Sequence, residues 1–332
     1  MDIVFAGTPE AAVPALEALA ASEHRIRAVL TRPDAPVGRR RVLTPSPVKA
    51  RALELGLEVI EAGRLRGEVI AQLRDLDVDA VAVVAYGAIA GPAALATARL
   101  GWFNLHFSLL PAHRGAAPVQ RALIAGETRS GVSVFRIDEG MDTGPVLRRR
   151  ELALDQPDVA TALDDYAHAG AGELVAAFDD LAAGTADFTE QAALIDAGEA
   201  ASHAEKITVD DAHLDFTHTA EAIIDRSRGT SPAPGPWAEI SGKRTKIFGL
   251  GPAVEVDIQP EPGLLTTRDR TAVLGCGDGW IAVAEIQPFG KARMAAVDFL
   301  RGHGEVRFDP VEAEPDPADT ESTSTEVPDP RA

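Results

Sequence analysis

Two kinds of apolar pattern alternate along the first part of the chain. Runs rich in apolar residues stand at 3–6, 25–31 and 79–85, and the last of them is nearly continuous. Such runs are typical of parallel strands that helices cover on both faces. Between the first two runs, apolar residues recur every three or four positions, which indicates a helix with one buried face. This alternation predicts a Rossmann-like α/β domain with a mostly parallel sheet.

The stretch at 101–145 combines strand-like runs with polar side chains that suit catalysis. Asn104, His106 and Ser108 are spaced by two, so on a strand they share one face, while the apolar residues between them share the other. A proline then ends this strand, because it lacks the N–H group that a ladder needs. Farther on, two glycines flank Asp142 and permit a sharp turn there. An amide, an imidazole and a carboxylate near strand ends predict a catalytic set.

The second half of the chain has a different pattern. Short strands broken by Gly- and Pro-containing turns fill residues 238–287, and this spacing predicts a small β-barrel. From residue 307 on, Pro, Glu, Asp, Ser and Thr dominate, as is typical of disordered segments. We therefore expect four parts: a catalytic domain at 1–189, a linker at 190–208, a barrel domain at 209–304 and an acidic disordered tail at 305–332.

The composition is that of a soluble globular protein. The 332 residues are 45% hydrophobic and 25% charged, which is sufficient to bury large cores in two domains. We expect a cytoplasmic protein, because no apolar run reaches the length of about 18 residues that a membrane span needs and the N-terminus lacks the cationic region of a signal peptide. The single Cys276 excludes an intrachain disulfide, and with no Cys or His near it we expect no metal site.

The charge distribution bears on nucleic-acid binding. The net charge of −19 argues against indiscriminate binding to nucleic acids. However, residues 1–150 carry 19 Lys and Arg against 16 Asp and Glu, whereas residues 151–208 carry 1 against 13. Four prolines at 32–47 predict an irregular loop, with three consecutive arginines near its middle. This loop is either a solvated surface or a local phosphate contact, since guanidinium groups suit phosphate oxygens.

Three segments together resemble the folate-dependent formyltransferases: NLHFSLLP at 104–111, RGAAP at 114–118 and the aspartate at 142. Within that family the chain is most similar to the members that formylate methionyl initiator tRNA. Two positions depart from the family pattern, since Phe107 replaces a small residue and His113 replaces a tryptophan. By its spacing Phe107 faces away from the polar residues, so we expect it to leave the chemistry untouched.

The resemblance implies a donor, an acceptor and a set of site residues. It implies 10-formyltetrahydrofolate as formyl donor, methionyl initiator tRNA as acceptor, no metal, and a catalytic trio of Asn104, His106 and Asp142. Asn104 and a protonated His106 would donate hydrogen bonds to the developing oxyanion. Asp142 would raise the proton affinity of the imidazole and accept the proton of the amine. The residues implied in folate contact, for some of which a structural turn is the alternative, are Ser108, Leu109, Leu110, Pro111, Tyr86 and Gly87.

The resemblance also implies contacts with tRNA. In the family, the loop that matches residues 32–47 holds the acceptor end of the tRNA, and the second domain is an OB-like barrel that carries it. This assigns Arg39, Arg40 and Arg41 to tRNA binding. A weaker assignment falls on Lys206, the only basic residue in a very acidic stretch. We expect the protein to act as a monomer.

Two other interpretations stay open. A formyltransferase for a small amine, such as a ribonucleotide or an amino sugar, would share the catalytic trio but would not need the arginine loop and the second domain together. A non-catalytic or dehydrogenase-like nucleotide-binding protein would share the Rossmann sheet. Gly7 alone is no G-x-G-x-x-G fingerprint, so we expect no nicotinamide site. A failure to bind folate would favour this last interpretation.

Overall fold

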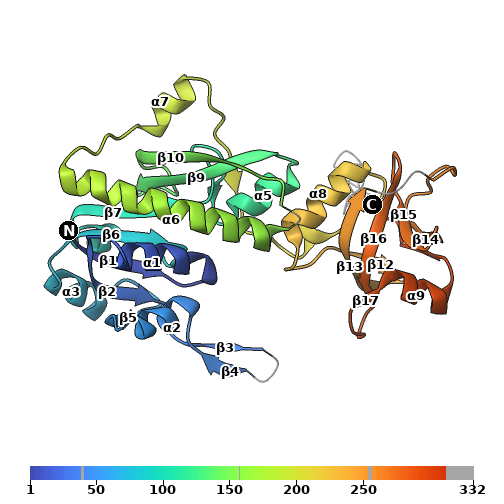
Figure 1. Cartoon of the computed structure of the whole chain (residues 1–332), viewed down its shortest axis with the longest axis horizontal. Helices are drawn as coiled ribbons and strands as arrows, with labels where there is room; N and C mark the ends of the chain where they lie inside the picture. Colours follow the sequence, from blue (N-terminus) through green and yellow to red (C-terminus); the bar gives the residue numbers. More distant parts are fainter. Residues whose placement is uncertain (39–40, 157, 253–255, 312–332) are drawn as a thin grey trace, which may run out of the picture. The chain divides into compact units, whose positions relative to one another are not determined.

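The computed structural model describes residues 1–38, 41–156, 158–252 and 256–311 (Figure 1). The chain divides into two compact units: Met1–His213 with Ile224–Pro236, and Leu214–Ile223 with Trp237–Ala332. The domain limits predicted at 189, 208 and 304 stay a prediction, and most of the predicted acidic tail, residues 312–332, lies outside the described residues. No helix in the described part of the chain is long and apolar enough to cross a membrane.

A seven-stranded sheet forms the centre of the first unit. Its strands lie in the order β10-β9-β7-β6-β1-β2-β5. The five strands from β7 to β5 are parallel; at one edge, β9 is antiparallel to its neighbour β7, and β10 is antiparallel to β9. The predicted mostly parallel α/β sheet is thereby confirmed. The bounds are β1 (Asp2–Gly7), β2 (Arg25–Thr31), β5 (Val59–Glu61), β6 (Val78–Val84), β7 (Ala98–His106), β9 (Arg129–Arg136) and β10 (Val146–Ala153).

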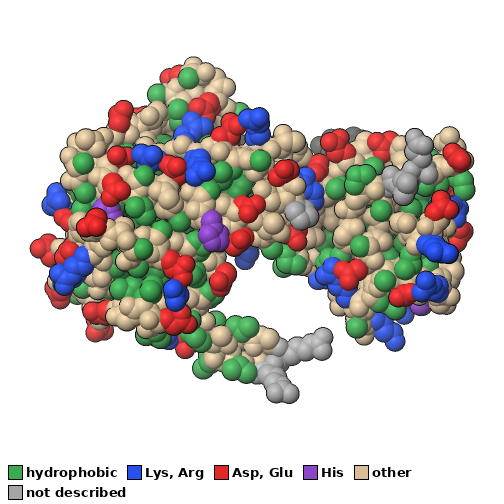
Figure 2. Space-filling model, in the orientation of Figure 1, with side chains coloured by type: hydrophobic (Ala, Val, Ile, Leu, Met, Phe, Trp, Pro, Cys, Tyr) green, Lys and Arg blue, Asp and Glu red, His purple; other side chains and the backbone are tan. Residues whose placement is uncertain are grey.

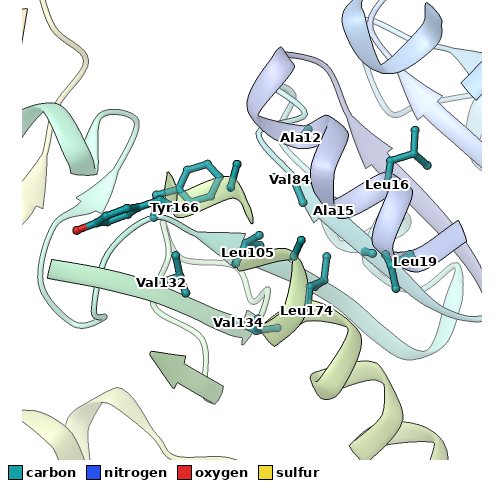
Figure 3. Close-up of a cluster of buried hydrophobic side chains, with 14 of the residues drawn as sticks. Ala12, Ala15, Leu16, Leu19, Val84, Leu105, Val132, Val134, Tyr166 and Leu174 are labelled. Atoms are coloured by element: carbon teal, nitrogen blue, oxygen red, sulfur yellow. The ribbon is translucent and has the colours of Figure 1, made fainter. Parts of the chain in front are cut away.

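Helices cover both faces of this sheet (Figure 1). Figure 3 shows the core on one face, where Leu16 and Leu19 of α1 and Leu174 of α6 lie near Leu105 of β7 and Val134 of β9. A second buried cluster on the other face includes residues of α3 and α4. The bounds are η1 (Glu10–Ala12), α1 (Val13–Ala20), α2 (Pro47–Glu54), α3 (Glu68–Asp75), α4 (Pro92–Leu95), α5 (Pro118–Ile124) and α6 (Val159–Ala183).

Strand β7 places its residues on alternate faces, as the spacing by two predicts. Phe103 belongs to the cluster under α1 and α6, and Trp102 belongs to the cluster on the opposite face. Asn104 and His106 share the face of Trp102, but they stand at the C-terminal end of the strand, where they line a cavity. Phe107 joins the cluster of Phe103 and also borders that cavity.

Two short paired strands lie within the stretch at 32–47 that was predicted as an irregular loop. β3 (Ala35–Val37) pairs antiparallel with β4 (Val42–Thr44), and Pro36 lies opposite Leu43. A proline is tolerated because each strand of an isolated hairpin is an edge, where half of the backbone groups need no ladder bond. The prediction that prolines forbid regular structure here was therefore wrong. Figure 2 shows apolar side chains along this hairpin, and Leu43 is 67% exposed.

The segment predicted as a linker, 190–208, contains two elements of the first unit. They are α7 (Gln191–Asp196) and β11 (His203–Ala204). β11 pairs in parallel with β8 (Arg114–Gly115), a two-residue strand next to the cavity. The segment is thus folded against the part of the chain that carries the RGAAP motif.

An antiparallel sheet forms the second unit, with β12-β13-β16-β15-β14-β18 in order and β17 beside β16. The main-chain N–H of Asp309, just after β18, donates to the carbonyl of Glu239 in β12 at 2.8 Å and so links the two ends of the sheet. This agrees with the predicted barrel. The bounds are β12 (Trp237–Ile240), β13 (Lys243–Pro252), β14 (Leu264–Arg268), β15 (Thr271–Gly275), β16 (Trp280–Gln287), β17 (Met294–Ala295), α9 (Ala296–His303) and β18 (Val306–Arg307). Before them in the chain, η2 (Asp210–Ala212) belongs to the first unit, and α8 (Ala220–Thr230) has residues in both units.

The packing of α6 on the sheet predicts a measurable stability difference. Leu174→Ala should lower the free energy of unfolding by about 2–5 kcal/mol, because truncating a fully buried leucine leaves a cavity. Leu53→Ala is the control, since Leu53 is 58% exposed on α2 and its truncation should cost less than about 0.5 kcal/mol. Urea denaturation of the purified variants measures both values. Equal stabilities would contradict the described packing of α6.

Candidate active site

A cavity of about 610 Å³ opens at the C-terminal ends of β6 and β7. Its wall comes from four segments of the first unit, which lie within residues 83–90, 102–107, 115–118 and 137–142. In open α/β sheets this edge is where ligands bind, because the strands end there and the loops that follow them diverge. The volume lies in the range of pockets that enclose a small organic molecule, about 300–1,000 Å³.

The three residues predicted as a catalytic trio meet in this cavity. Asn104 and His106 enter from β7, and Asp142 enters from the loop between β9 and β10. The Nδ1 atom of His106 lies 3.8 Å from Oδ2 of Asp142. The same carboxylate oxygen accepts a hydrogen bond from the main-chain N–H of Gly115 at 2.8 Å. The fold thus gathers residues that are up to 38 positions apart in the sequence, Asn104 and Asp142.

One hydrogen bond determines which nitrogen of His106 faces Asp142. Nε2 lies 2.9 Å from the carbonyl oxygen of His113, so Nε2 carries a hydrogen and donates it. The neutral imidazole therefore presents the lone pair of Nδ1 toward Asp142. The imidazole is only 5% exposed, and burial lowers the pKa of His106, although the charge of Asp142 acts to raise it. Desolvation is the larger effect, so the shift favours a neutral His106; the protonated His106 expected from the sequence stays a prediction.

The side chain of Asn104 can form a hydrogen bond with a molecule in the cavity. It is half-buried and lines the cavity. Within the ranges that the structure describes, the amide of Asn104 makes no hydrogen bond with the protein, so its N–H groups can donate to a molecule in the cavity.

The turn at 108–111 lies beside the cavity rather than in its wall. The buried hydroxyl of Ser108 donates to the carbonyl of Ala112 at 2.6 Å. Ser133 in β9 donates to the carbonyl of Ser108 at 2.7 Å and accepts from the N–H of Leu110 at 3.0 Å. The turn therefore fixes the chain that leads to His113. A contact of folate with Ser108, Leu109, Leu110 or Pro111 stays a prediction.

Tyr86 and Gly87, which follow β6, do line the cavity. The hydroxyl of Tyr86 donates to the carbonyl of Ala62 at 2.6 Å, and burial raises the pKa of Tyr86 to about 12, so this side chain anchors the loop. The carbonyls of both residues also accept hydrogen bonds, from Thr8 at 2.8 Å and from Arg32 at 2.7 Å. Both predicted roles, a structural turn and a pocket border, are compatible with this position.

His113, where the family pattern has a tryptophan, contributes to the site through its main chain. Its carbonyl holds His106, and its own imidazole Nε2 lies 2.7 Å from Oε1 of Glu127. Sequence reasoning missed the roles of the His113 carbonyl and the Gly115 N–H, because nearly every residue has such groups and only the fold selects which of them is used. It also missed two exposed apolar residues of the cavity, Ile89 (89% exposed) and Met141 (68%).

Two of the residues assigned to tRNA, Arg41 and Lys206, stand apart from the cavity wall. Arg41 is exposed at the turn of hairpin β3–β4, where its N–H donates to the carbonyl of Gly38 at 3.1 Å. Arg39 and Arg40 lie outside the described residues. Lys206 is exposed just after β11. No group of three or more His, Cys, Asp or Glu side chains that could hold a metal ion occurs in the part of the chain that the structure describes.

Comparison with known proteins identifies the family. The family model described as formyl transferase matches residues 1–176, and the model of the formyl transferase C-terminal domain matches residues 206–304. The methionyl-tRNA formyltransferase of Arthrobacter sp. (strain FB24) is 44% identical over 304 residues, which are 91% of this chain and 97% of the relative. That of Leifsonia xyli subsp. xyli is 45% identical over 305 residues, 92% of this chain and 98% of the relative.

A solved structure shows the likeness of the fold. The N-formyltransferase from Helicobacter canadensis, in complex with folinic acid and dTDP-3-aminofucose, aligns with a TM-score of 0.63 at 18% identity, covering 86% of this chain and 99% of that one. The resemblance drawn from three short segments is confirmed by the family models and the relatives. Because one family model covers more than half of the chain and relatives above 40% identity match along nearly their whole length, the chain belongs to the formyltransferase family, among the methionyl-tRNA formyltransferases.

Proposed function

We propose that this chain transfers the formyl group of 10-formyltetrahydrofolate to the α-amine of methionyl initiator tRNA. The observation that carries the proposal is the meeting of Asn104, His106 and Asp142 in one cavity of a chain whose relatives are methionyl-tRNA formyltransferases. The roles of the three side chains follow from their contacts. The folate co-substrate supplies an activated formyl group, and the residues of the chain orient it and manage charge and protons.

Asn104 is suited to stabilise negative charge. As the amine attacks the formyl carbon, the formyl oxygen gains negative charge, and a donor fixed in advance lowers the barrier. The amide of Asn104 faces the cavity without a protein partner among the described residues, so it can donate to that oxygen at no cost to the fold. A half-buried position strengthens such a hydrogen bond, because less water competes for it.

His106 and Asp142 are suited to receive the proton of the amine. The neutral imidazole directs the lone pair of Nδ1 at Asp142, so two proton acceptors stand 3.8 Å apart. A proton released by the amine can be taken up between them, since the carboxylate stabilises the imidazolium that forms. This assigns His106 a role as acceptor, whereas the sequence had led us to expect a protonated donor.

The cavity fits the folate donor in size and lining. Its volume of about 610 Å³ suits a bicyclic ring system with its substituents. The segment at 85–90 supplies main-chain groups next to apolar side chains, among them Ile89. Main-chain N–H and carbonyl groups can pair with a polar heterocycle while apolar side chains cover its faces. The cavity and the trio belong to the first unit of a single chain, which supports action as a monomer; a cytoplasmic location is part of the same proposal.

A small-amine acceptor remains the second candidate function. It would use the same trio, and the hairpin β3–β4 would then be a plain surface element. The exposed position of Arg41 on that hairpin favours the tRNA acceptor, because an unshielded guanidinium is free to meet phosphate. Assaying transfer of labelled formyl to charged initiator tRNA against small amines separates the two candidates. Transfer to a small amine alone would contradict the tRNA proposal.

Asp142→Asn tests the role of the carboxylate. The variant should fold and bind folate but lower kcat by about 10²–10⁴, the usual contribution of a general acid–base group, because an amide cannot take up the proton. Asp196→Asn makes the same chemical change at an exposed residue of α7 and should keep wild-type kcat. Single-turnover formyl transfer measures the effect. A kcat near wild type in Asp142→Asn would remove this residue from the proposed mechanism.

Asn104→Ala and His106→Ala test whether the polar groups act together. Each should reduce kcat. Asn104→Ala removes the proposed oxyanion donor, and such a loss typically lowers kcat by about 10²–10³. The double variant should lose much less than the product of the two, since members of one catalytic unit fail together. Melting temperatures near wild type exclude unfolding as the cause. Full multiplicative losses would show that the two side chains act independently.

Substitution of the three consecutive arginines at 39–41 tests whether the formyl acceptor is a tRNA. Replacing Arg39, Arg40 and Arg41 by Ala should raise KM for tRNA and leave folate affinity unchanged. The slope of log affinity against log salt should flatten by about 0.7–0.9 for each phosphate that the variant no longer neutralises. The control replaces three other exposed arginines and so removes the same charge: Arg64, Arg66 and Arg74. Equal behaviour of the two triple variants would make the hairpin a solvated surface and favour the small-amine acceptor.

A further inference from the structure

Gln191, the first residue of α7, is a buried polar residue outside the cavity wall. It is only 2% exposed. Its Nε2 donates to the carbonyl oxygen of Asp142 and to that of Gly144, both at 2.8 Å. Its Oε1 accepts from Nε and Nη2 of Arg114, at 2.9 and 2.7 Å. Both hydrogens of the amide nitrogen and both lone pairs of the oxygen are therefore used.

These four hydrogen bonds join the two segments that orient the Asp142 carboxylate. One segment is the main chain of Asp142 itself. The other is β8, where Arg114 precedes Gly115, whose N–H donates to Oδ2 of Asp142. A shift of either segment would move the carboxylate relative to Nδ1 of His106. Gln191 holds both segments from outside the cavity.

The conformation of the Asp142 loop needs such support. Asp142 has a φ of 55°, in the left-handed region that residues other than glycine rarely adopt. The loop between β9 and β10 has its own internal contacts at Asp138, which accepts from Gly140 and from Thr143. Those contacts stay within the loop. The hydrogen bonds from Gln191 tie the loop to the rest of the first unit.

The same segment of chain also holds the partner of His106. The hydroxyl of Ser202 accepts from the N–H of His113 at 2.8 Å, and the carbonyl of Ser202 accepts from the N–H of Arg114 at 2.9 Å. The carbonyl of His113 in turn accepts from His106. The stretch from α7 to β11 therefore contacts the supports of both members of the His106–Asp142 pair.

We propose that Gln191 is a positioning residue for formyl transfer, which fixes the Asp142 carboxylate against His106 through hydrogen bonds to the loop and to Arg114. The inference rests on the proposed function. Gln191 acts through Asp142, since its side chain does not line the cavity. Sequence reasoning had placed it in a linker, so nothing in the local pattern pointed to this role.

Gln191→Glu is the main test, because it keeps the acceptor oxygen of the side chain and removes its N–H donors. The carboxylate keeps acceptors for Arg114, and an ion pair replaces the former neutral hydrogen bonds there. It has no N–H for the carbonyls of Asp142 and Gly144. We expect kcat for methionyl-tRNA formylation to fall about 10- to 100-fold, as for a displacement of about 1 Å at a catalytic group, with KM for tRNA within about twofold of wild type.

Two further variants complete the kinetic test. Gln191→Met keeps the length of the side chain, removes all four hydrogen bonds and should reduce kcat at least as much. Glu190→Gln is the control, an exposed neighbour for which kcat should not change. Melting temperatures establish that the variants are folded. A Gln191→Glu variant with wild-type kcat would overturn the proposal.

Hydrogen exchange tests the positioning independently of activity. In Gln191→Glu, amides of residues 138–144 and of Gly115 should exchange faster than in wild type, while those of β9 stay protected. Unchanged exchange at these amides would overturn the proposal whatever the kinetics show. If the wild type fails to formylate methionyl-tRNA, the proposed function fails, and the exchange result still decides whether Gln191 holds the loop.

Discussion

The hydrogen bond from Nε2 of His106 to the carbonyl of His113 determines how the site can work. It engages the Nε2 atom of the imidazole in a hydrogen bond with the protein and leaves Nδ1 as the nitrogen that faces Asp142. Burial lowers the pKa of the ring, because removing water penalises the charged form more than Asp142 favours it. With a neutral His106, the site has two adjacent proton acceptors and, in Asn104, a donor that makes no hydrogen bond with the protein in the part of the chain that the structure describes. That combination suits an attack by an amine, in which one oxygen gains charge and one nitrogen loses a proton.

The arrangement needs several parts of the chain at once. Strand β7 sets the direction of Asn104 and His106, since a covered central strand fixes both its register and its faces. The loop after β9 brings Asp142, and β8 brings the N–H of Gly115. The segment around α7 and β11 then ties β8 to that loop. The segment around α7 and β11 thus holds in place the residues that surround the cavity, although it lies far from β7 in the sequence.

In contrast to the packed segments around the site, the hairpin β3–β4 is exposed and has few contacts that stabilise it. An isolated two-stranded hairpin is marginally stable in water, because it buries little apolar surface. Near its base, Lys49 of α2 donates to Asp34 at 2.6 Å and to Glu61 at 2.7 Å, which ties the hairpin to α2 and to β5. Its apolar side chains stay exposed, Leu43 among them. Such a surface is costly in water, and its exposure is understandable where a large partner covers it.

The local pattern of residues determined the sheet and the direction of β7, and together with the family resemblance it pointed to the three residues that meet in the cavity. Spacing by two is a property of any strand, so Asn104 and His106 could be placed on one face from the sequence alone. Tertiary structure decided what no local pattern encodes. It chose the carbonyl of His113 as the partner of His106, and it folded the expected linker back so that Gln191 reaches the loop of Asp142. Main-chain groups are the same at every position, and a contact across 49 residues depends on the whole fold. The burial that lowers the pKa of His106 is likewise a property of the packed structure and not of the local sequence.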